Sequence, residues 1–115
     1  MRREERLRRG ADFSAVYREG GAWAHPLFVL RARNNDRTTN RYGIVVGRRV
    51  GKAVVRNRIR RHLREALRHS PVKQGWDLVI IARQPAAKTD FREVAATVEA
   101  LLRRANLWNE KGGLQ

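Results

Sequence analysis

The sequence predicts an α+β fold, a two-layer α/β sandwich in which helices pack against one small mixed sheet. Two segments, 53–68 and 90–105, space their apolar residues as amphipathic helices do. Between them, residues 77–82 form a short continuous apolar run, and two further strand-like runs precede the first segment. With a short helix at the start of the chain the predicted order is α-β-β-(β)-α-β-α, and the bracket allows for one more short strand near residues 22–25.

The N-terminal part supplies the first helix and two strands. Asp12 is expected to cap a helix whose apolar residues lie at positions i, i+3 and i+4, namely Phe13, Val16 and Tyr17. Residues 27–33 alternate as a strand does, with Phe28 and Leu30 set against Val29 and Arg31. A polar connection, 34–40, leads to a second and largely buried strand at 42–47.

The C-terminal part supplies the long helices and the central strand. Residues 77–82 (DLVIIA) are apolar without interruption, which is typical of a strand covered on both faces. Gln84 and Pro85 end this strand. Asp90 and Glu93 have the spacing of a capping box for the last helix, and Phe91 is interpreted as part of the apolar core face of that helix.

Length and composition indicate one domain spanning residues 1–115, with 1–9 and 109–115 as flexible tails. The chain has no cysteine, and no apolar run approaches the roughly 20 residues that span a bilayer. The N-terminus has no apolar stretch of the kind found in secretory signals. We therefore expect a cytoplasmic protein without a membrane partner.

Positive charge is the strongest functional signal. Lys and Arg number 26 against 11 Asp and Glu, which gives a net charge of +15. Nine of these basic residues and only one acid lie between Arg48 and Arg68, so 21 residues carry +8 and the other 94 carry +7. Such a concentration predicts a polyanionic partner, and nucleic acid is the leading candidate.

The predicted helix from Ala53 to Arg68 separates apolar and basic residues. On a helical wheel the residues Val55, Ile59, Leu63, Ala66 and Leu67 form one stripe, and the arginines lie on the far side. Arg56, Arg60 and Arg64 repeat like charges at i, i+4, and further cations crowd the helix N-terminus, where the helix dipole disfavours them. A solvated surface is the alternative interpretation, but almost no acids are interleaved. Phosphates between the arginines explain the pattern better.

No catalytic or metal-binding constellation is visible in the sequence. The three histidines are scattered, and His62, at the edge of the apolar stripe, is interpreted as a packed side chain. No pair of carboxylates or histidines has a spacing suited to acid–base chemistry or metal binding. Gly47 to Ala53 superficially resembles a phosphate-binding loop, but it lacks one residue between its glycines and has Ala53 where Ser or Thr binds magnesium.

The segment from Gly51 to Glu65 (GKAVVRNRIRRHLRE) closely resembles the signature of the protein subunit of bacterial ribonuclease P. The similarity extends over about residues 5–108, with matching positions in the opening helix, the strands and the closing helix. The sequence departs from the family pattern at four positions, where Arg60 replaces a frequent Lys, Tyr17 a frequent Phe, Gln84 a common Lys and Gly47 a usual Ser.

This resemblance implies a protein that assists a ribozyme. The RNA subunit of ribonuclease P removes the 5′ leader of precursor tRNA with bound Mg²⁺, so the protein alone is expected to be non-catalytic and to bind no metal itself. The implied partners are ribonuclease P RNA, as a 1:1 heterodimer, and precursor tRNA. The resemblance also implies the rare left-handed βαβ crossover, against the right-handed connection that general experience favours.

The resemblance assigns two groups of RNA-binding residues. Contacts to the RNA subunit are expected from Arg56, Asn57, Arg58, Arg60, Arg61 and Arg64. Contacts to the single-stranded leader are expected in a cleft between the first helix and the sheet, from Phe13, Tyr17, Phe28, Arg48, Arg49, Lys52 and Arg83. Aromatic stacking together with a basic groove is how single strands are usually bound. At helical spacing, however, Phe13 and Tyr17 could instead belong to the core.

Two other functions remain open at this point. One is a ribosomal protein of similar fold that binds ribosomal RNA, and the other is a nuclease that cleaves RNA without an RNA subunit. Sedimentation with ribosomes would identify the first, and cleavage without added RNA would identify the second.

Overall fold

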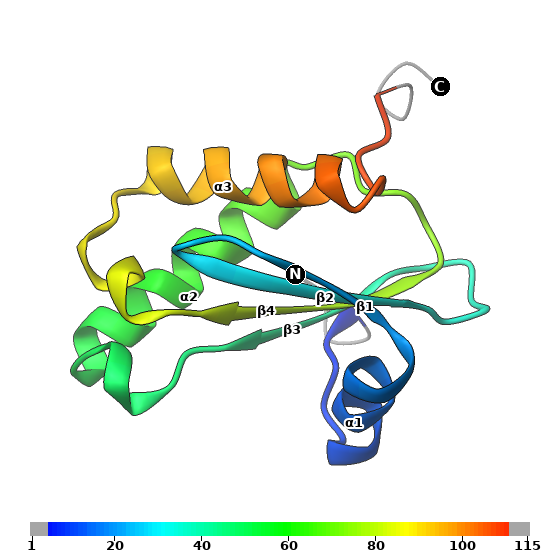
Figure 1. Cartoon of the computed structure of the whole chain (residues 1–115), viewed down its shortest axis with the longest axis horizontal. Helices are drawn as coiled ribbons and strands as arrows, with labels where there is room; N and C mark the ends of the chain where they lie inside the picture. Colours follow the sequence, from blue (N-terminus) through cyan, green and yellow to red (C-terminus); the bar gives the residue numbers. More distant parts are fainter. Residues whose placement is uncertain (1–4, 111–115) are drawn as a thin grey trace.

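The computed structural model describes residues 5–110, which form three α-helices and a four-stranded sheet (Figure 1). In chain order the elements are α1 (Gly10–Glu19), β1 (Gly21–Ala24), β2 (Phe28–Asn34), β3 (Arg41–Val45), η2 (Arg48–Val50), α2 (Ala53–Arg68), β4 (Trp76–Ala82), η3 (Gln84–Lys88) and α3 (Phe91–Arg104). The α+β fold and the element order are confirmed. The short strand allowed for near residues 22–25 is β1.

Strand β4 lies inside the sheet, as its uninterrupted apolar run predicts. The strand order is β1-β2-β4-β3, in which the pairs β1–β2 and β2–β4 are antiparallel and the pair β4–β3 is parallel. Ile80 of β4 stands opposite Leu30 of β2 and Ile44 of β3. The sheet is therefore mixed, and α2 connects its one parallel pair of strands.

Helices α2 and α3 cover one face of the sheet, and α1 lies against the other (Figure 1). The larger core fills the space between the sheet and the pair α2 and α3, and its fully buried side chains include Phe28, Leu30, Ile59, Leu63 and Leu78. The capping box that starts α3 is confirmed, since Asp90 accepts from Glu93 N and Glu93 accepts from Asp90 N.

A second, smaller cluster lies between α1 and the opposite face of the sheet. Its buried members are Leu7, Val16 and Val79, with Phe13, Val45 and Ile81 packed beside them. Leu7 also donates its backbone N–H to Tyr42 O at 2.8 Å. The segment 5–9, predicted as part of a flexible tail, is thus packed at Leu7, whereas 1–4 and 111–115 lie outside the described residues.

Two predictions about individual side chains are wrong. Asp12 does not cap α1, because the N-cap is Arg9, with no side-chain hydrogen bond, and Asp12 instead pairs with Arg41 at 3.4 Å. Phe91 is not core, because at the first position of α3 it remains 39% exposed. Its ring stands edge-on to His62 with 5.6 Å between centroids, which confirms that His62 is a packed side chain.

Candidate RNA-binding surfaces

The basic surface of α2 arises because the helix uses its entire apolar stripe for the core. Ile59, Leu63, Ala66 and Leu67 are buried against the sheet and α3, which leaves the arginines on the outer side. Lys52 occupies the N-cap position, and the first turn contains no acidic residue. The predicted separation of apolar and basic faces is confirmed. We call the set Arg56, Asn57, Arg58, Arg60, Arg61 and Arg64 the α2 arginine face.

The members of the α2 arginine face differ in how firmly the protein holds them. Asn57, Arg61 and Arg64 are exposed, and within residues 5–110 the guanidinium groups of Arg61 and Arg64 make no hydrogen bond or ion pair. Three others are half-buried and donate to neighbouring oxygens: Arg56 to Gly51 O, Arg58 to Ala87 O and Arg60 to Asn57 Oδ1. The face therefore combines oriented cations with free ones.

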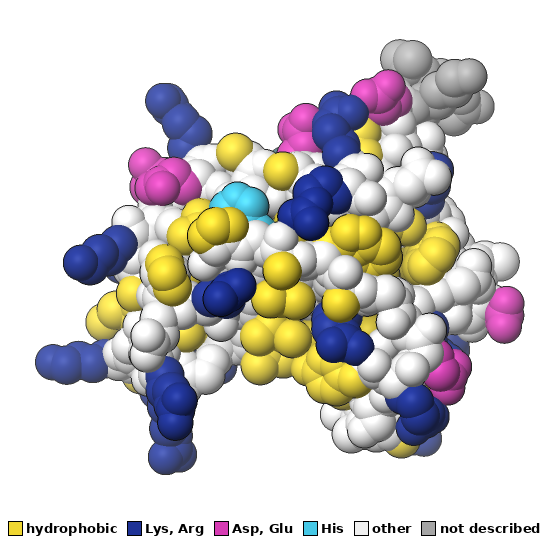
Figure 2. All heavy atoms as spheres, viewed as in Figure 1, with side chains coloured by type: hydrophobic (Ala, Val, Ile, Leu, Met, Phe, Trp, Pro, Cys, Tyr) yellow, Lys and Arg dark blue, Asp and Glu magenta, His cyan; other side chains and the backbone are white. Residues whose placement is uncertain are grey.

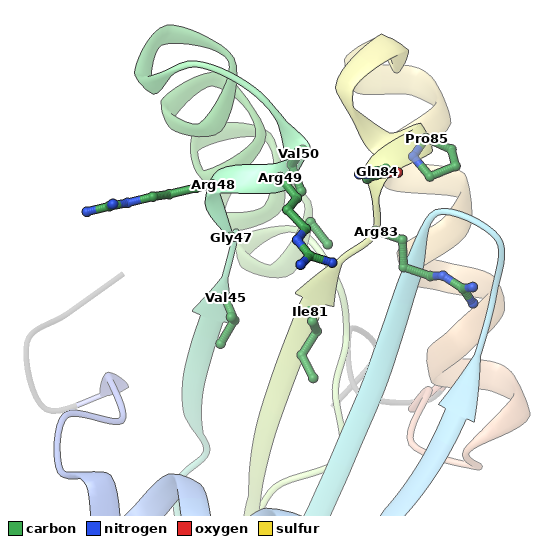
Figure 3. Close-up of a pocket in the computed structure, with 10 residues that line it drawn as sticks. Val45, Gly47, Arg48, Arg49, Val50, Ile81, Arg83, Gln84 and Pro85 are labelled. Atoms are coloured by element: carbon green, nitrogen blue, oxygen red, sulfur yellow. The ribbon is translucent and has the colours of Figure 1, made fainter.

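A groove of about 580 Å³ opens where the parallel strands β3 and β4 end (Figure 3). Val45 and Ile81, which belong to the α1 side of the sheet, contribute apolar walls. The Arg49 side chain extends across the groove between the two strand ends, while Arg48 points outward into solvent. Arg83 stands on the other rim, with Nη1 3.4 Å from His25 O. We call this hollow the strand-end groove.

The strand-end groove brings together some of the predicted leader-binding residues. Arg48, Arg49 and Arg83 line it, together with Gln84. Lys52 is exposed at the start of α2 and is not among the lining residues. Figure 2 shows Lys and Arg side chains projecting from the end of the molecule where η2 and the start of α2 lie. The phosphates of a single strand would meet mainly cations at this end.

Aromatic side chains of α1 lie beside the same sheet face. Phe13 packs so closely on β3 that a Cβ at Gly43 would stand 2.5 Å from the ring, and Phe13 is only half-buried. Tyr17 is 39% exposed, and the Arg31 guanidinium lies 5.2 Å from its ring centroid. A nucleobase could therefore reach both rings.

The assignment of Phe28 to this cleft is wrong. Phe28 is fully buried within the larger core, on the side of the sheet covered by α2 and α3. Since neighbouring strand residues face opposite sides, Val29, Arg31 and Arg33 are the β2 residues on the α1 side. Arg31 is the residue that the sequence reasoning missed, although its alternation with Phe28 and Leu30 already placed it there.

A small pocket of about 160 Å³ connects the two predicted groups at the edge of the sheet. Phe13 of α1 and Arg60 and Arg64 of α2 line it, around the edge strand β3. The α2 arginine face and the aromatic cleft beside α1 are thus neighbours around β3. One extended RNA surface could run from one to the other.

The His62 ring is packed and uncharged. Burial, and then the positive charges of Arg61 and Arg58, lower the pKa of His62, which keeps this ring neutral at pH 7.

Among residues 5–110 no three His, Cys, Asp or Glu side chains are grouped so that they could hold a metal ion. Nor does any helix in that range have the length and apolar character needed to cross a membrane.

Fold and surface together define a small α+β protein in which one long helix presents an arginine-rich outer face. The family model described as Ribonuclease P matches residues 1–106. The chain belongs to this family. It is 44% identical over 110 residues to the ribonuclease P protein component of Roseiflexus castenholzii, which covers 93% of this chain and 90% of the relative. The protein component of Dehalococcoides mccartyi is 39% identical over 107 residues, covering 93% and 89%.

Solved structures show the same architecture. The RNase P protein of Staphylococcus aureus superposes with a TM-score of 0.83 at 33% identity, covering 91% of this chain and 98% of that one. The protein from Thermotoga maritima gives 0.79 at 36% identity, covering 87% and 96%. A crossover of the opposite hand would move α2 to the other face of the sheet, so this chain shares the hand of those proteins. The alternative interpretation of the chain as a ribosomal protein of similar fold is not supported by these comparisons.

Proposed function

We propose that this chain is the protein subunit of a bacterial ribonuclease P and promotes removal of the 5′ leader from precursor tRNA. The α2 arginine face binds the RNA subunit in a 1:1 complex. The cleft beside α1 and the strand-end groove hold the single-stranded leader. The RNA subunit carries the cleavage chemistry with Mg²⁺, and the complex acts in the cytoplasm.

The observation that carries this proposal is the free cationic surface of α2 in a member of the ribonuclease P family. Two features of α2 are costly unless an anion neutralises them: like charges repeated at i, i+4 along one face, and cations at its N-terminus with no acid in the first turn. The opposite side of the same helix packs in the hydrophobic core, so the backbone that carries the arginines is held in a fixed position. A structured RNA offers phosphates at comparably fixed positions.

Aromatic rings and apolar groove walls, in addition to positive charge, support the leader-binding part of the proposal. Phe13 and Tyr17 offer ring faces, and each base stacked on an aromatic ring contributes about 1–3 kcal/mol to single-strand binding. Arg49 lies over an apolar-walled groove and Arg83 stands at its rim, so phosphates can be bound there while bases lie on Val45 and Ile81. Neither binding of the RNA subunit nor binding of the leader requires a side chain of the protein to act as a general acid or base.

The test is cleavage of precursor tRNA at limiting Mg²⁺ by a bacterial ribonuclease P RNA, with and without this protein. We expect accurate 5′ maturation only when protein and RNA are both present, and no cleavage by the protein alone. An Arg61→Ala/Arg64→Ala variant should require more protein for the same rate. Cleavage by the protein alone, or no effect on the ribozyme, would contradict the proposal.

A further inference from the structure

Helix α1 has little of its own to hold it in place. It contains ten residues, and helices this short are marginal in isolation. Val16 is its one buried residue, and its N-cap makes no side-chain hydrogen bond. The apolar cluster beneath it is much smaller than the core under α2 and α3. Some other interaction must fix its position over the sheet.

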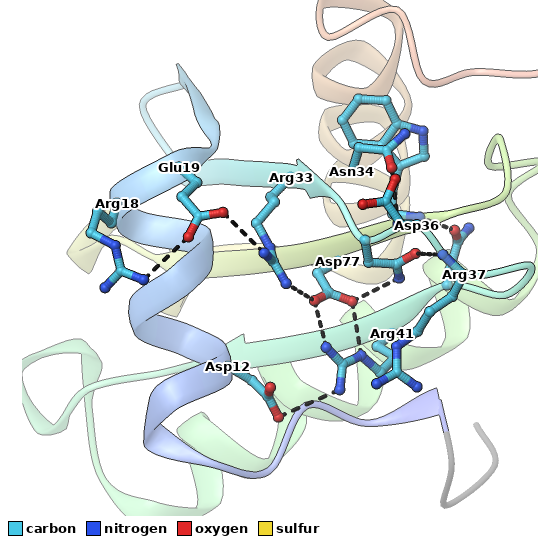
Figure 4. Close-up of polar contacts among 12 residues, drawn as sticks. Asp12, Arg18, Glu19, Arg33, Asn34, Asp36, Arg37, Arg41 and Asp77 are labelled. Carbon is cyan, nitrogen blue, oxygen red and sulfur yellow. Dashed lines mark hydrogen bonds and ion pairs between the residues drawn. The ribbon is translucent and has the colours of Figure 1, made fainter.

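That interaction is a chain of ion pairs centred on Asp77 of β4 (Figure 4). The Asp77 carboxylate is fully buried and receives two hydrogen bonds from Arg41, at 2.9 and 2.7 Å. It also receives one from Asn35 at 2.9 Å and one from Arg33 at 3.4 Å. A buried charge is costly without partners, so Asp77 holds both guanidinium groups firmly.

Each of the two arginines reaches one end of α1. Arg41 Nη1 lies 3.4 Å from Asp12 Oδ2 in the first turn, and Arg33 Nη1 lies 3.1 Å from Glu19 Oε1 at the last residue. Arg33 and Arg41 are themselves mostly shielded from solvent. Because their side chains are already fixed by Asp77, less conformational entropy is lost in each pair than in an ordinary surface ion pair.

We infer that Asp77 is a positioning residue for leader binding, because through Arg33 and Arg41 it fixes both ends of α1 and so places Phe13 and Tyr17 over the sheet. This inference rests on the proposed function. We call the set Asp12, Glu19, Arg33, Arg41 and Asp77 the α1 clamp. Arg31 reinforces it by donating to Tyr17 O.

The ionisation of the clamp is consistent with this role. Burial raises the pKa of Asp77, but hydrogen bonds from Arg41 and Asn35 and the charge of Arg41 lower it, and the net shift is downward. Hydrogen bonds from Arg33 and Arg18 lower the pKa of Glu19. Both carboxylates are therefore anionic at neutral pH.

When acids of the α1 clamp are neutralised, the clamp predicts weaker binding of the leader, whereas net charge alone predicts stronger binding. Replacing Asp12 and Glu19 with neutral amides makes the surface beside the cleft more positive, which by itself strengthens RNA binding. If the clamp positions α1, the same replacements loosen the aromatic rings and weaken binding of the leader. The direction of the change separates the two explanations.

The experiment uses the complex of this protein with a bacterial ribonuclease P RNA and compares affinities for precursor and mature tRNA. The variant is Asp12→Asn/Glu19→Gln, and the matched control is Glu99→Gln/Glu110→Gln, which also neutralises two carboxylates and removes both ion pairs of Arg103 on α3. We expect about five-fold weaker binding of the precursor, with mature tRNA and RNA-subunit affinity unchanged. Asp12→Glu, which keeps the charge, should retain more leader binding than Asp12→Asn.

Asp77→Asn perturbs the α1 clamp more strongly and is expected to weaken precursor binding further. If this variant does not fold, Asp12→Asn/Glu19→Gln still tests whether the clamp positions α1. Hydrogen exchange should accelerate in α1 but not in α2 or α3. Equal or tighter precursor binding by the double variant would overturn the clamp while leaving the proposed function intact. Failure of the wild type to distinguish precursor from mature tRNA would overturn both.

Discussion

Helices α1 and α2 lie on opposite faces of the same sheet and are held there in different ways. Helix α2 buries four apolar residues in the large core and directs its arginines outward. Helix α1 buries one residue, and ion pairs fix its two ends. The cationic face of α2 is thus carried by rigid apolar packing. The position of α1, and with it the aromatic cleft, depends on charge.

The largest difference between the two sides should appear in stability. Leu63→Ala in the large core is expected to lower the free energy of unfolding by about 2–5 kcal/mol. Val16→Ala, which removes two methyl groups from the small cluster, should cost about 2 kcal/mol or less. Urea unfolding followed by circular dichroism measures both. A loss for Val16→Ala equal to that for Leu63→Ala would show that α1 is held by packing after all.

The α2 side should respond to salt and to loss of charge. Arg61→Ala/Arg64→Ala is expected to weaken binding to ribonuclease P RNA roughly tenfold and to reduce the slope of log K against log salt by about one per lost phosphate contact. Titrations at several salt concentrations measure both quantities. Arg37→Ala, which removes one exposed charge between β2 and β3, is the control for each of the single replacements Arg61→Ala and Arg64→Ala. An equal loss in the control would mean that net charge, not the helix face, determines binding.

The α1 side should respond to loss of a ring. Tyr17→Ala is expected to weaken binding of precursor tRNA by about 1–3 kcal/mol and to leave mature tRNA unaffected, because only the precursor carries a leader. Phe91 provides a matched control, since it is also 39% exposed but lies on α3, away from the cleft. Competition binding with both tRNAs measures the difference. Losses of the same size for Phe91→Ala would remove any special role for Tyr17.

The sequence was sufficient where the determining interactions are local. The helix Ala53–Arg68 was predicted with the bounds that the structure gives, because its apolar period and its basic face agree. The capping box at Asp90 depends on residues three apart and was also found. Both signals lie within one element, so no knowledge of the tertiary structure was needed.

Long-range contacts account for what the sequence did not provide. Asp77 is bound by residues 36 and 44 positions away, and no local pattern distinguishes it from a strand-end acid. The alternation in β2 separated Phe28 from Arg31 correctly, but which face α1 covers is decided by the whole sheet. Phe28 was therefore assigned to the wrong side. The individual contacts to RNA remain predictions.

The smallest expected effect concerns Gln84, which lines the strand-end groove at a position where the resemblance to the family led us to expect lysine. Gln84 is exposed, so Gln84→Lys can add a cation without disturbing the core. One more phosphate contact should tighten precursor binding a few-fold at low salt, and the gain should disappear at high salt. Binding of the RNA subunit should stay constant, because the groove and the α2 arginine face have no member in common. A parallel gain for the RNA subunit would mean that the strand-end groove contacts that RNA rather than the leader.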